Sequence, residues 1–190
     1  MKQLPHIYNQ PQFGDETEQW FTYPTLYTDM VKKFSSGSVF VEVGAHKGKS
    51  SSYMCVEIAN SYKDIKFFVV DFWYSEGKAD RFKIFMDNMK PLKKRFKPLH
   101  MTSIEASKKF ADNSIDFVFL DAGHEYEDVI EDVKAWYPKL KWHGVMAGHD
   151  YYPGQPTWGG AYKAVHHLLD IGYLPNLSYA KDDCFYIEKK

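Results

Sequence analysis

The chain has 190 residues, and its 24 basic and 25 acidic side chains leave a formal net charge of −1. A near-neutral chain has no global electrostatic drive toward nucleic acid or an anionic membrane. Its two cysteines exclude a disulfide scaffold and a cysteine-rich metal site. The sequence also lacks an apolar run long enough to span a membrane and a signal-peptide pattern, so we expect a cytoplasmic protein.

Apolar runs alternate with segments of helical periodicity along most of the chain. We expect an N-terminal arm over 1–37, with a short helix at 23–34, followed by a single globular domain over 38–190. The expected strands are 38–43, 65–71, 96–101, 115–120 and 144–147. The expected helices between and after them are 49–62, 79–95, 104–110, 124–140 and 157–171. A terminal antiparallel hairpin is predicted from 177–180 and 184–187.

This alternation predicts an α/β fold with a parallel sheet covered on both faces. Ligands of such sheets bind beyond the carboxyl ends of the strands, so the residues after each strand are the candidates. Gly44 and Gly48 follow the first strand and would allow a tight turn before a helix N-terminus, although such glycines are common in ordinary strand–helix turns. Asp71 ends the second strand and either caps a helix or accepts hydrogen bonds from a ribose diol. Phe72 could then provide an apolar wall.

Polar residues also follow the other three strands. Ser103 follows the third, where it could start a helix or contact an adenine edge. Asp121 and His124 follow the fourth; a histidine titrates near neutrality and suits proton abstraction, while Asp121 could instead cap the next helix. His149 and Asp150 follow the fifth. Asp121, His149 and Asp150 could together hold a divalent ion such as Mg²⁺ or Mn²⁺.

Four of these features together resemble a known family. The run VEVGAHKGKSS, the acid Asp71, the segment DAGHEYEDVIEDVKAW and the run HGVMAGHDYY are similar to class I S-adenosylmethionine-dependent methyltransferases. More narrowly, they resemble the small methyltransferases related to macrocin-type sugar O-methyltransferases and cephalosporin hydroxylase-like proteins. The resemblance covers about 38–190. It implies a methyltransferase domain with a Rossmann-like, doubly wound seven-stranded sheet, mostly parallel with an antiparallel C-terminal strand.

The resemblance also implies how the cofactor, S-adenosylmethionine, would be held. Glu42, Gly44 and Gly48 would shape the pocket for its methionine part, Asp71 would bind the ribose and Ser103 would approach the adenine. The chain departs from the family's glycine pattern because Ala-His-Lys stands between Gly44 and Gly48, without the extra glycine. A pyrophosphate needs closer backbone approach than a methionine tail, so this departure weakens a dinucleotide interpretation more than a methyltransferase one.

For the reacting groups, the resemblance implies that Asp121 and His124 face the transferred methyl and the acceptor. Related metal-dependent enzymes place acids where Asp121, His149 and Asp150 stand here, and the histidine at 149 departs from that pattern. Six aromatic residues after strand ends are expected to close the pocket and exclude water: Trp73, Tyr74, Tyr126, Tyr151, Tyr152 and Trp158.

The resulting hypothesis is O-methylation of a small-molecule hydroxyl of the sugar or natural-product type. A nicotinamide-dependent oxidoreductase and a cofactor-binding protein that catalyses nothing are the alternatives. A nucleic-acid methyltransferase is disfavoured because the Asp-Pro-Pro-aromatic motif of base amino-methylating enzymes is absent. The sequence leaves the acceptor and the oligomeric state open, a homodimer being one option. The N-terminal arm could exchange between subunits or cover the active site.

Overall fold

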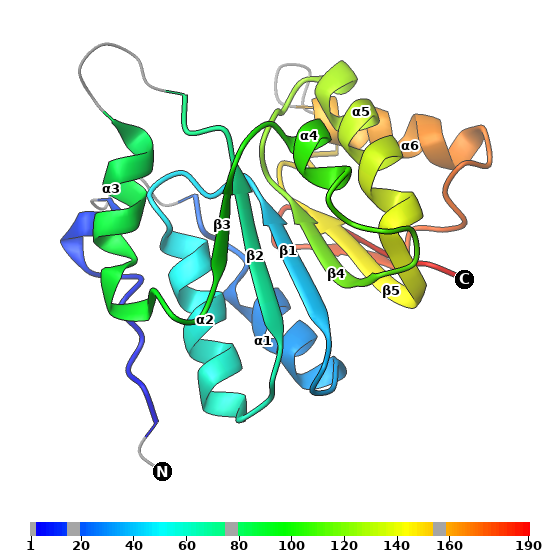
Figure 1. The fold of residues 1–190 in the computed structure, drawn as a ribbon. Helices are drawn as coiled ribbons and strands as arrows, with labels where there is room; N and C mark the ends of the chain where they lie inside the picture. Colours follow the sequence, from blue (N-terminus) through cyan, green and yellow to red (C-terminus); the bar gives the residue numbers. More distant parts are fainter. Residues whose placement is uncertain (1–2, 15–19, 75–79, 154–158) are drawn as a thin grey trace.

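The computed structural model describes residues 3–14, 20–74, 80–153 and 159–190. Its centre is a seven-stranded sheet in the order β3-β2-β1-β4-β5-β7-β6 (Figure 1). Strands β1 to β5 run parallel, and β7 lies antiparallel between β5 and β6. This arrangement confirms the predicted mostly parallel sheet with an antiparallel C-terminal strand. The strands are β1 Val39–Val43, β2 Lys66–Asp71, β3 Lys97–His100, β4 Ile115–Leu120, β5 Leu140–Gly148, β6 Tyr179–Lys181 and β7 Cys184–Glu188.

Three helices cover each face of the sheet (Figure 1). One face carries α1 Pro24–Lys33, α2 Lys49–Ser61 and α3 Arg81–Asn88. The other carries α4 Ser103–Ser107, α5 Tyr126–Trp136 and α6 Gly160–Asp170. Short 3₁₀ turns complete the elements at η1 Pro11–Phe13, η2 Lys90–Leu92 and η3 Tyr137–Lys139. In the described ranges no helix is both long and apolar enough to cross a membrane.

The apolar strands contribute buried side chains to two hydrophobic cores, one on each side of the sheet. Successive side chains of a strand point to opposite faces, and the central strands are apolar on both. Phe40 of β1 and Phe117 of β4 therefore pack under α1 and α2, whereas Val41 and Val118 pack under α5 and α6. All four side chains are at most 1% exposed, which fixes the register of the sheet and the positions of its carboxyl ends.

Two of the predicted helices are cut short at prolines. The segment predicted as one helix over 79–95 contains α3, which ends at Asn88 and gives way to η2. Pro91 causes the break, because it has no backbone N–H to continue the ladder. The helix predicted over 124–140 begins at Tyr126 and ends at Trp136, since Pro138 follows. The first residues of the helices predicted over 79–95 and 157–171 lie outside the described residues.

The N-terminal residues pack onto the same body as the rest of the chain. Helix α1 buries Leu26, Tyr27, Met30 and Val31 in the core that also contains β1. Ahead of it, the backbone of Leu4 exchanges two hydrogen bonds with the Asn60 side chain on α2. The segment 20–23 directly precedes α1 and lies beside the carboxyl ends of the strands, where Tyr23 contacts Asp121.

Candidate functional site

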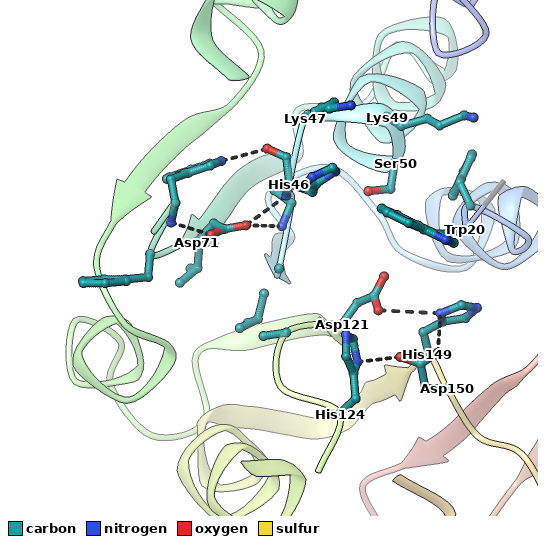
Figure 2. Close-up of a pocket in the computed structure, with 18 of the residues that line it drawn as sticks. Trp20, His46, Lys47, Lys49, Ser50, Asp71, Asp121, His124, His149 and Asp150 are labelled. Atoms are coloured by element: carbon teal, nitrogen blue, oxygen red, sulfur yellow. Dashed lines mark hydrogen bonds and ion pairs between the residues drawn. The ribbon is translucent and has the colours of Figure 1, made fainter. Parts of the chain in front are cut away.

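A cavity of about 1080 Å³ lies at the carboxyl ends of the parallel strands (Figure 2). Its wall includes residues at or just after the carboxyl ends of five different strands: Gly44, Asp71, Ser103, Asp121 and Asp150. The order of strands reverses between β1 and β4, and that switch point is where open α/β sheets bind ligands. The fold therefore gathers in one cavity most of the residues that the sequence selected strand by strand.

Asp71 anchors the loop between β1 and α2. Its Oδ2 accepts hydrogen bonds from the backbone N–H groups of Ala45 and His46 over 2.8 and 2.9 Å. Its Oδ1 accepts a third bond from the backbone of Trp73 over 2.6 Å. A carboxylate offers about four lone-pair sites, so about one remains for a ligand hydroxyl. The main chain thus fixes both the loop and the acid beside it.

Gly44 lines the cavity at a point where two chain segments meet. A Cβ at this position would lie 1.9 Å from the backbone oxygen of Asp121, and its φ is +91°. No residue with a side chain fits without moving the end of β4. Gly48 also has φ +91°, but its missing Cβ faces Met89, and Gly48 is absent from the cavity wall. Gly48 instead forms the left-handed turn that starts α2.

Glu42 lies behind the cavity wall, 1% exposed, rather than on it. Burial raises the pKa of its carboxyl to about 7, against the opposing effect of hydrogen bonds from Ser50, Ser51 and Tyr27. The hydroxyl of Tyr27 donates to Oε1 over 2.8 Å, and Ser51 donates to Oε2. One of its partners, Ser50, does line the cavity.

Ser103 lines the cavity, but its hydroxyl is engaged by α5. It donates to a carboxylate oxygen of Asp132 and accepts a hydrogen bond from Trp136 Nε1 over 2.9 Å. Burial raises the pKa of Asp132 to about 6. The hydroxyl contact with an adenine that the sequence suggested would have to compete with this network.

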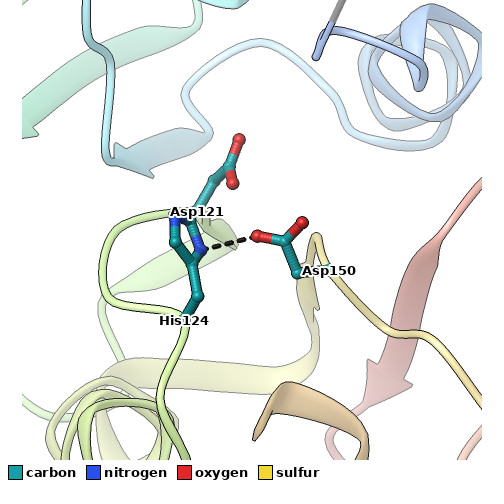
Figure 3. A group of neighbouring side chains, drawn as sticks. All are labelled: Asp121, His124 and Asp150. Atoms are coloured by element: carbon teal, nitrogen blue, oxygen red, sulfur yellow. Dashed lines mark ion pairs between the residues drawn. The ribbon is translucent and has the colours of Figure 1, made fainter. Parts of the chain in front are cut away.

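The other end of the cavity is built from ionisable side chains (Figure 3). His124 Nδ1 lies 2.5 Å from Asp150 Oδ2, and Asp121 stands beside this pair. One ligand atom from each of Asp121, His124 and Asp150 lies within 4.8 Å of the others. Two carboxylates and an imidazole are ligands that divalent ions accept. The structure therefore brings the two predicted acids together with His124 rather than with His149 in this group.

His149 is buried next to this group. Its Nδ1 lies 3.6 Å from Asp121 Oδ1 and 3.3 Å from Asp150 Oδ1. Its Nε2 lies 3.1 Å from the hydroxyl of Thr22, which donates its own proton to the carbonyl of Asp182. Burial lowers the pKa of His149, but its contacts with the two acids outweigh this and raise it overall. These contacts place the His149 ring against the two acids and Thr22, outside the group formed by Asp121, His124 and Asp150.

The sequence suggested that the N-terminal arm could cover the active site, but it selected no residue of the segment before α1. Trp20, Phe21, Thr22 and Tyr23 all line the cavity. The hydroxyl of Tyr23 donates to Asp121 Oδ2 over 2.7 Å. No local signal marks these residues, because a tyrosine at the start of an apolar helix usually packs in the core. Their contacts join residues that are 98 and 127 positions apart in sequence, so they form only in the folded chain.

The aromatic residues predicted to close the pocket divide into three groups. Trp73, Tyr74 and Tyr152 line the cavity. Phe72 lines it too and stacks on Tyr74, with 6.4 Å between the two ring centroids. Tyr126 and Tyr151 do not line it, so their prediction was wrong. Tyr151 is buried on the far side, where its hydroxyl meets His166 Nε2 at 2.7 Å, and Tyr126 packs on the α5–α6 core. Trp158 lies outside the described residues.

Fold and cavity together are those of the class I S-adenosylmethionine-dependent methyltransferases. The sequence model of the methyltransferase-domain family matches 41–151, more than half of the chain, and the chain belongs to this family. Its relative y4gI from Sinorhizobium fredii is 28% identical over 149 residues, which is 75% of this chain. The chain spans 16% of the length of y4gI.

Solved structures share the fold at low sequence identity. CalS11, a TDP-rhamnose 3'-O-methyltransferase of calicheamicin biosynthesis, superposes with a TM-score of 0.63 at 14% identity, covering 87% of this chain and 76% of its own. SMU.1697c from Streptococcus mutans, solved in complex with SAH, gives a TM-score of 0.57 at 13% identity and covers 87% and 97%. These similarities confirm the fold that the sequence resemblance implied.

Proposed function

We propose that this chain transfers a methyl group from S-adenosylmethionine to the oxygen of a small-molecule hydroxyl. The observation that carries the proposal is that the two ends of the cavity differ in their chemistry. One end presents Asp71 and a loop fixed by the main chain, and the other presents Asp121, His124 and Asp150. A cofactor held at the first end would direct its reactive group toward the second.

The residues at the first end fit S-adenosylmethionine. Asp71 keeps hydrogen-bonding capacity for a ribose hydroxyl, and the exposed ring of Phe72 offers a face for the adenine. Gly44 and Ser50 would border the methionine part, with Glu42 supporting Ser50 from behind. The cofactor, when bound, supplies a methyl group already activated on a sulfonium. The protein's remaining task is to align the acceptor and remove its proton.

His124 is the proposed proton acceptor. Asp150 fixes the ring through Nδ1, which leaves Nε2 to take the hydroxyl proton of an acceptor in the cavity. This hydrogen bond with Asp150 is also the main reason why the pKa of His124 is raised. His149 lies beside both acids and, when protonated, would offset their negative charge.

A divalent ion is compatible with the same group. Asp121, His124 and Asp150 would hold it, and an ion of the Mg²⁺ or Mn²⁺ type would stabilise a deprotonated acceptor oxygen. His124 would then be a ligand rather than a base. Calorimetric titration with Mn²⁺ separates the two roles, since the base role requires no ion and the ligand role predicts binding that Asp121→Asn abolishes.

The acceptor class rests on similarity. CalS11 acts on a sugar hydroxyl, and a sugar or natural-product hydroxyl is the corresponding proposal for this chain. Family membership disfavours the nicotinamide-dependent alternative. A protein that binds the cofactor without catalysing a reaction would need the same Asp71 end of the cavity as a methyltransferase.

A panel of sugar, nucleotide-sugar and phenolic acceptors, assayed by SAH release, tests the proposal. Turnover on any hydroxyl acceptor that disappears in His124→Gln supports it. SAH binding without turnover on the whole panel would favour the silent binding protein, and a folded chain that binds neither S-adenosylmethionine nor SAH would contradict both.

A further inference from the structure

A tyrosine outside the matched family region contacts the reaction end of the cavity. Tyr23 immediately precedes α1, and its hydroxyl donates to Asp121 Oδ2 over 2.7 Å. Its ring is 2% exposed. The ring centroid lies 4.4 Å from that of Phe119 on β4 and 5.0 Å from that of His149. Packing on this scale holds the ring in place, so the phenol oxygen is a fixed point in the cavity wall.

Asp121 depends on such a fixed point for its orientation. It follows the last residue of β4, and its side chain borders the open cavity. Its other oxygen lies 3.6 Å from His149 Nδ1, beyond ordinary hydrogen-bond length. The bond from Tyr23 is therefore the shorter of the two contacts that hold the carboxylate.

We infer that Tyr23 is a positioning residue of the reaction site, which holds the Asp121 carboxylate beside His124 and Asp150. The inference rests on the proposed function, because it assigns Tyr23 a task in that same site. Without the hydroxyl, the Asp121 side chain would adopt other rotamers and the three potential ligand atoms would no longer stay together.

A second tyrosine provides a matched control four residues along the chain. Tyr27 is also fully buried, and its hydroxyl donates to Glu42 over 2.8 Å. Each tyrosine thus satisfies one carboxylate from the same side of the sheet. The Glu42 carboxylate, however, lies behind the cavity wall, whereas Asp121 lines it. If both hydroxyls only stabilised the fold, removing either of them would have the same consequences.

The experiment compares Tyr23→Phe with Tyr27→Phe in the full chain. Mn²⁺ affinity is measured by electron paramagnetic resonance, SAH affinity by calorimetry, and the Asp121 side chain is observed in crystal structures of both variants. We expect Mn²⁺ affinity to fall about tenfold in Tyr23→Phe, as for other residues that orient metal ligands, and to stay unchanged in Tyr27→Phe. SAH affinity should change little in either. Incorporating 3-fluorotyrosine at position 23 keeps an O–H donor and should retain wild-type Mn²⁺ affinity.

Two results would overturn the inference: an Asp121 carboxylate that keeps its conformation in Tyr23→Phe with Mn²⁺ affinity unchanged, or equal losses of Mn²⁺ affinity in the two variants. If the wild-type chain binds no Mn²⁺, the metal-binding part of the proposed function fails. The conformation of Asp121 in the Tyr23→Phe crystal then decides the present inference by itself.

Discussion

The two ends of the cavity are built from different kinds of contact. At one end, Asp71 accepts three backbone N–H groups and ties together neighbouring strand ends. At the other, Asp121, His124 and Asp150 are held by side chains alone. Contacts to the main chain tolerate few alternative conformations, whereas side-chain pairs depend on rotamer and charge. Substitutions at the first end should therefore reduce stability and cofactor affinity, whereas substitutions at the second end should reduce turnover.

The largest expected effect is on turnover at the side-chain end. Asp150→Asn removes the charge that orients His124, and we expect the rate of SAH release on an active acceptor to fall between about 10²- and 10⁴-fold. Affinity for SAH should stay within about threefold. Asp150 has φ +57°, which asparagine tolerates, so the backbone is preserved. Asp183→Asn is the control, since its φ is +58° and it lies outside the cavity wall. A large loss of SAH affinity in Asp150→Asn would erase the distinction between the two ends.

The second effect concerns stability at the main-chain end. Gly44→Ala would place a methyl group 1.9 Å from the backbone oxygen of Asp121, in addition to the left-handed strain at φ +91°. Gly37→Ala carries the same strain at φ +90° but has open space around it. We expect about 1–2 kcal/mol of destabilisation for Gly37→Ala and at least about 3 kcal/mol more for Gly44→Ala. Urea unfolding measures both; similar values would show that β4 moves aside easily.

The third effect is a pH dependence of stability from Glu42. Its folded pKa of about 7 is above the ordinary value of 4.5, because burial disfavours the charge. The folded state thus binds the proton more tightly than the unfolded state. The resulting stabilisation is present below pH 4.5 and is lost as the pH rises through 7. It amounts to about 3 kcal/mol.

Glu42→Gln should remove this dependence. The free energy of unfolding of the variant, measured by urea titration from pH 5 to pH 8, should fall less steeply than that of the wild type. His124 and His149 remain in both proteins, so their contributions cancel in the difference. Parallel curves for the two proteins would mean that Glu42 ionises normally in the folded chain.

The smallest expected effect is on cofactor affinity. The Asp71 carboxylate accepts three backbone N–H groups, and Asp71→Asn replaces one of its oxygens with an NH₂ group, which is a donor. We expect SAH affinity to fall about tenfold, which corresponds to the loss of one hydrogen bond to a charged group. Asp80→Asn is the control, because Asp80 also accepts a backbone N–H, from Lys83, but lies outside the cavity wall. Unchanged SAH affinity in Asp71→Asn would remove Asp71 from the cofactor site.

The same contrast explains what the sequence could predict. The sheet and the strand ends follow from local patterns, so Gly44, Asp71, Asp121 and Asp150 could be selected one strand at a time. The direction of each side chain could not, because it is set by distant partners. Ser103 turns its hydroxyl to α5, and Glu42 turns away from the cavity.

The reaction end was the hardest to predict because its contacts are the least local. His124 and His149 were both visible as histidines after strands. Their different places in the site depend on distant partners: His149 contacts Thr22, 127 positions away in sequence, whereas His124 lies with Asp121 and Asp150 in the metal-compatible group. Tyr23 carried no signal at all, since its hydroxyl acts 98 positions away from Asp121 in sequence. By contrast, the break in the helix predicted over 79–95 had a local signal in Pro91.

The central claim is that the Asp71 end of the cavity holds the ribose of the cofactor and that the Asp121 end faces its reactive group. A crystal structure with SAH and Mn²⁺ tests this claim most directly. We expect the ribose hydroxyls within hydrogen-bond distance of Asp71, and the SAH sulfur on the side of Asp121. An anomalous peak between Asp121, His124 and Asp150 would place the ion. A nucleoside bound at the Asp121 end, or a cavity without SAH at a saturating concentration, would contradict the account.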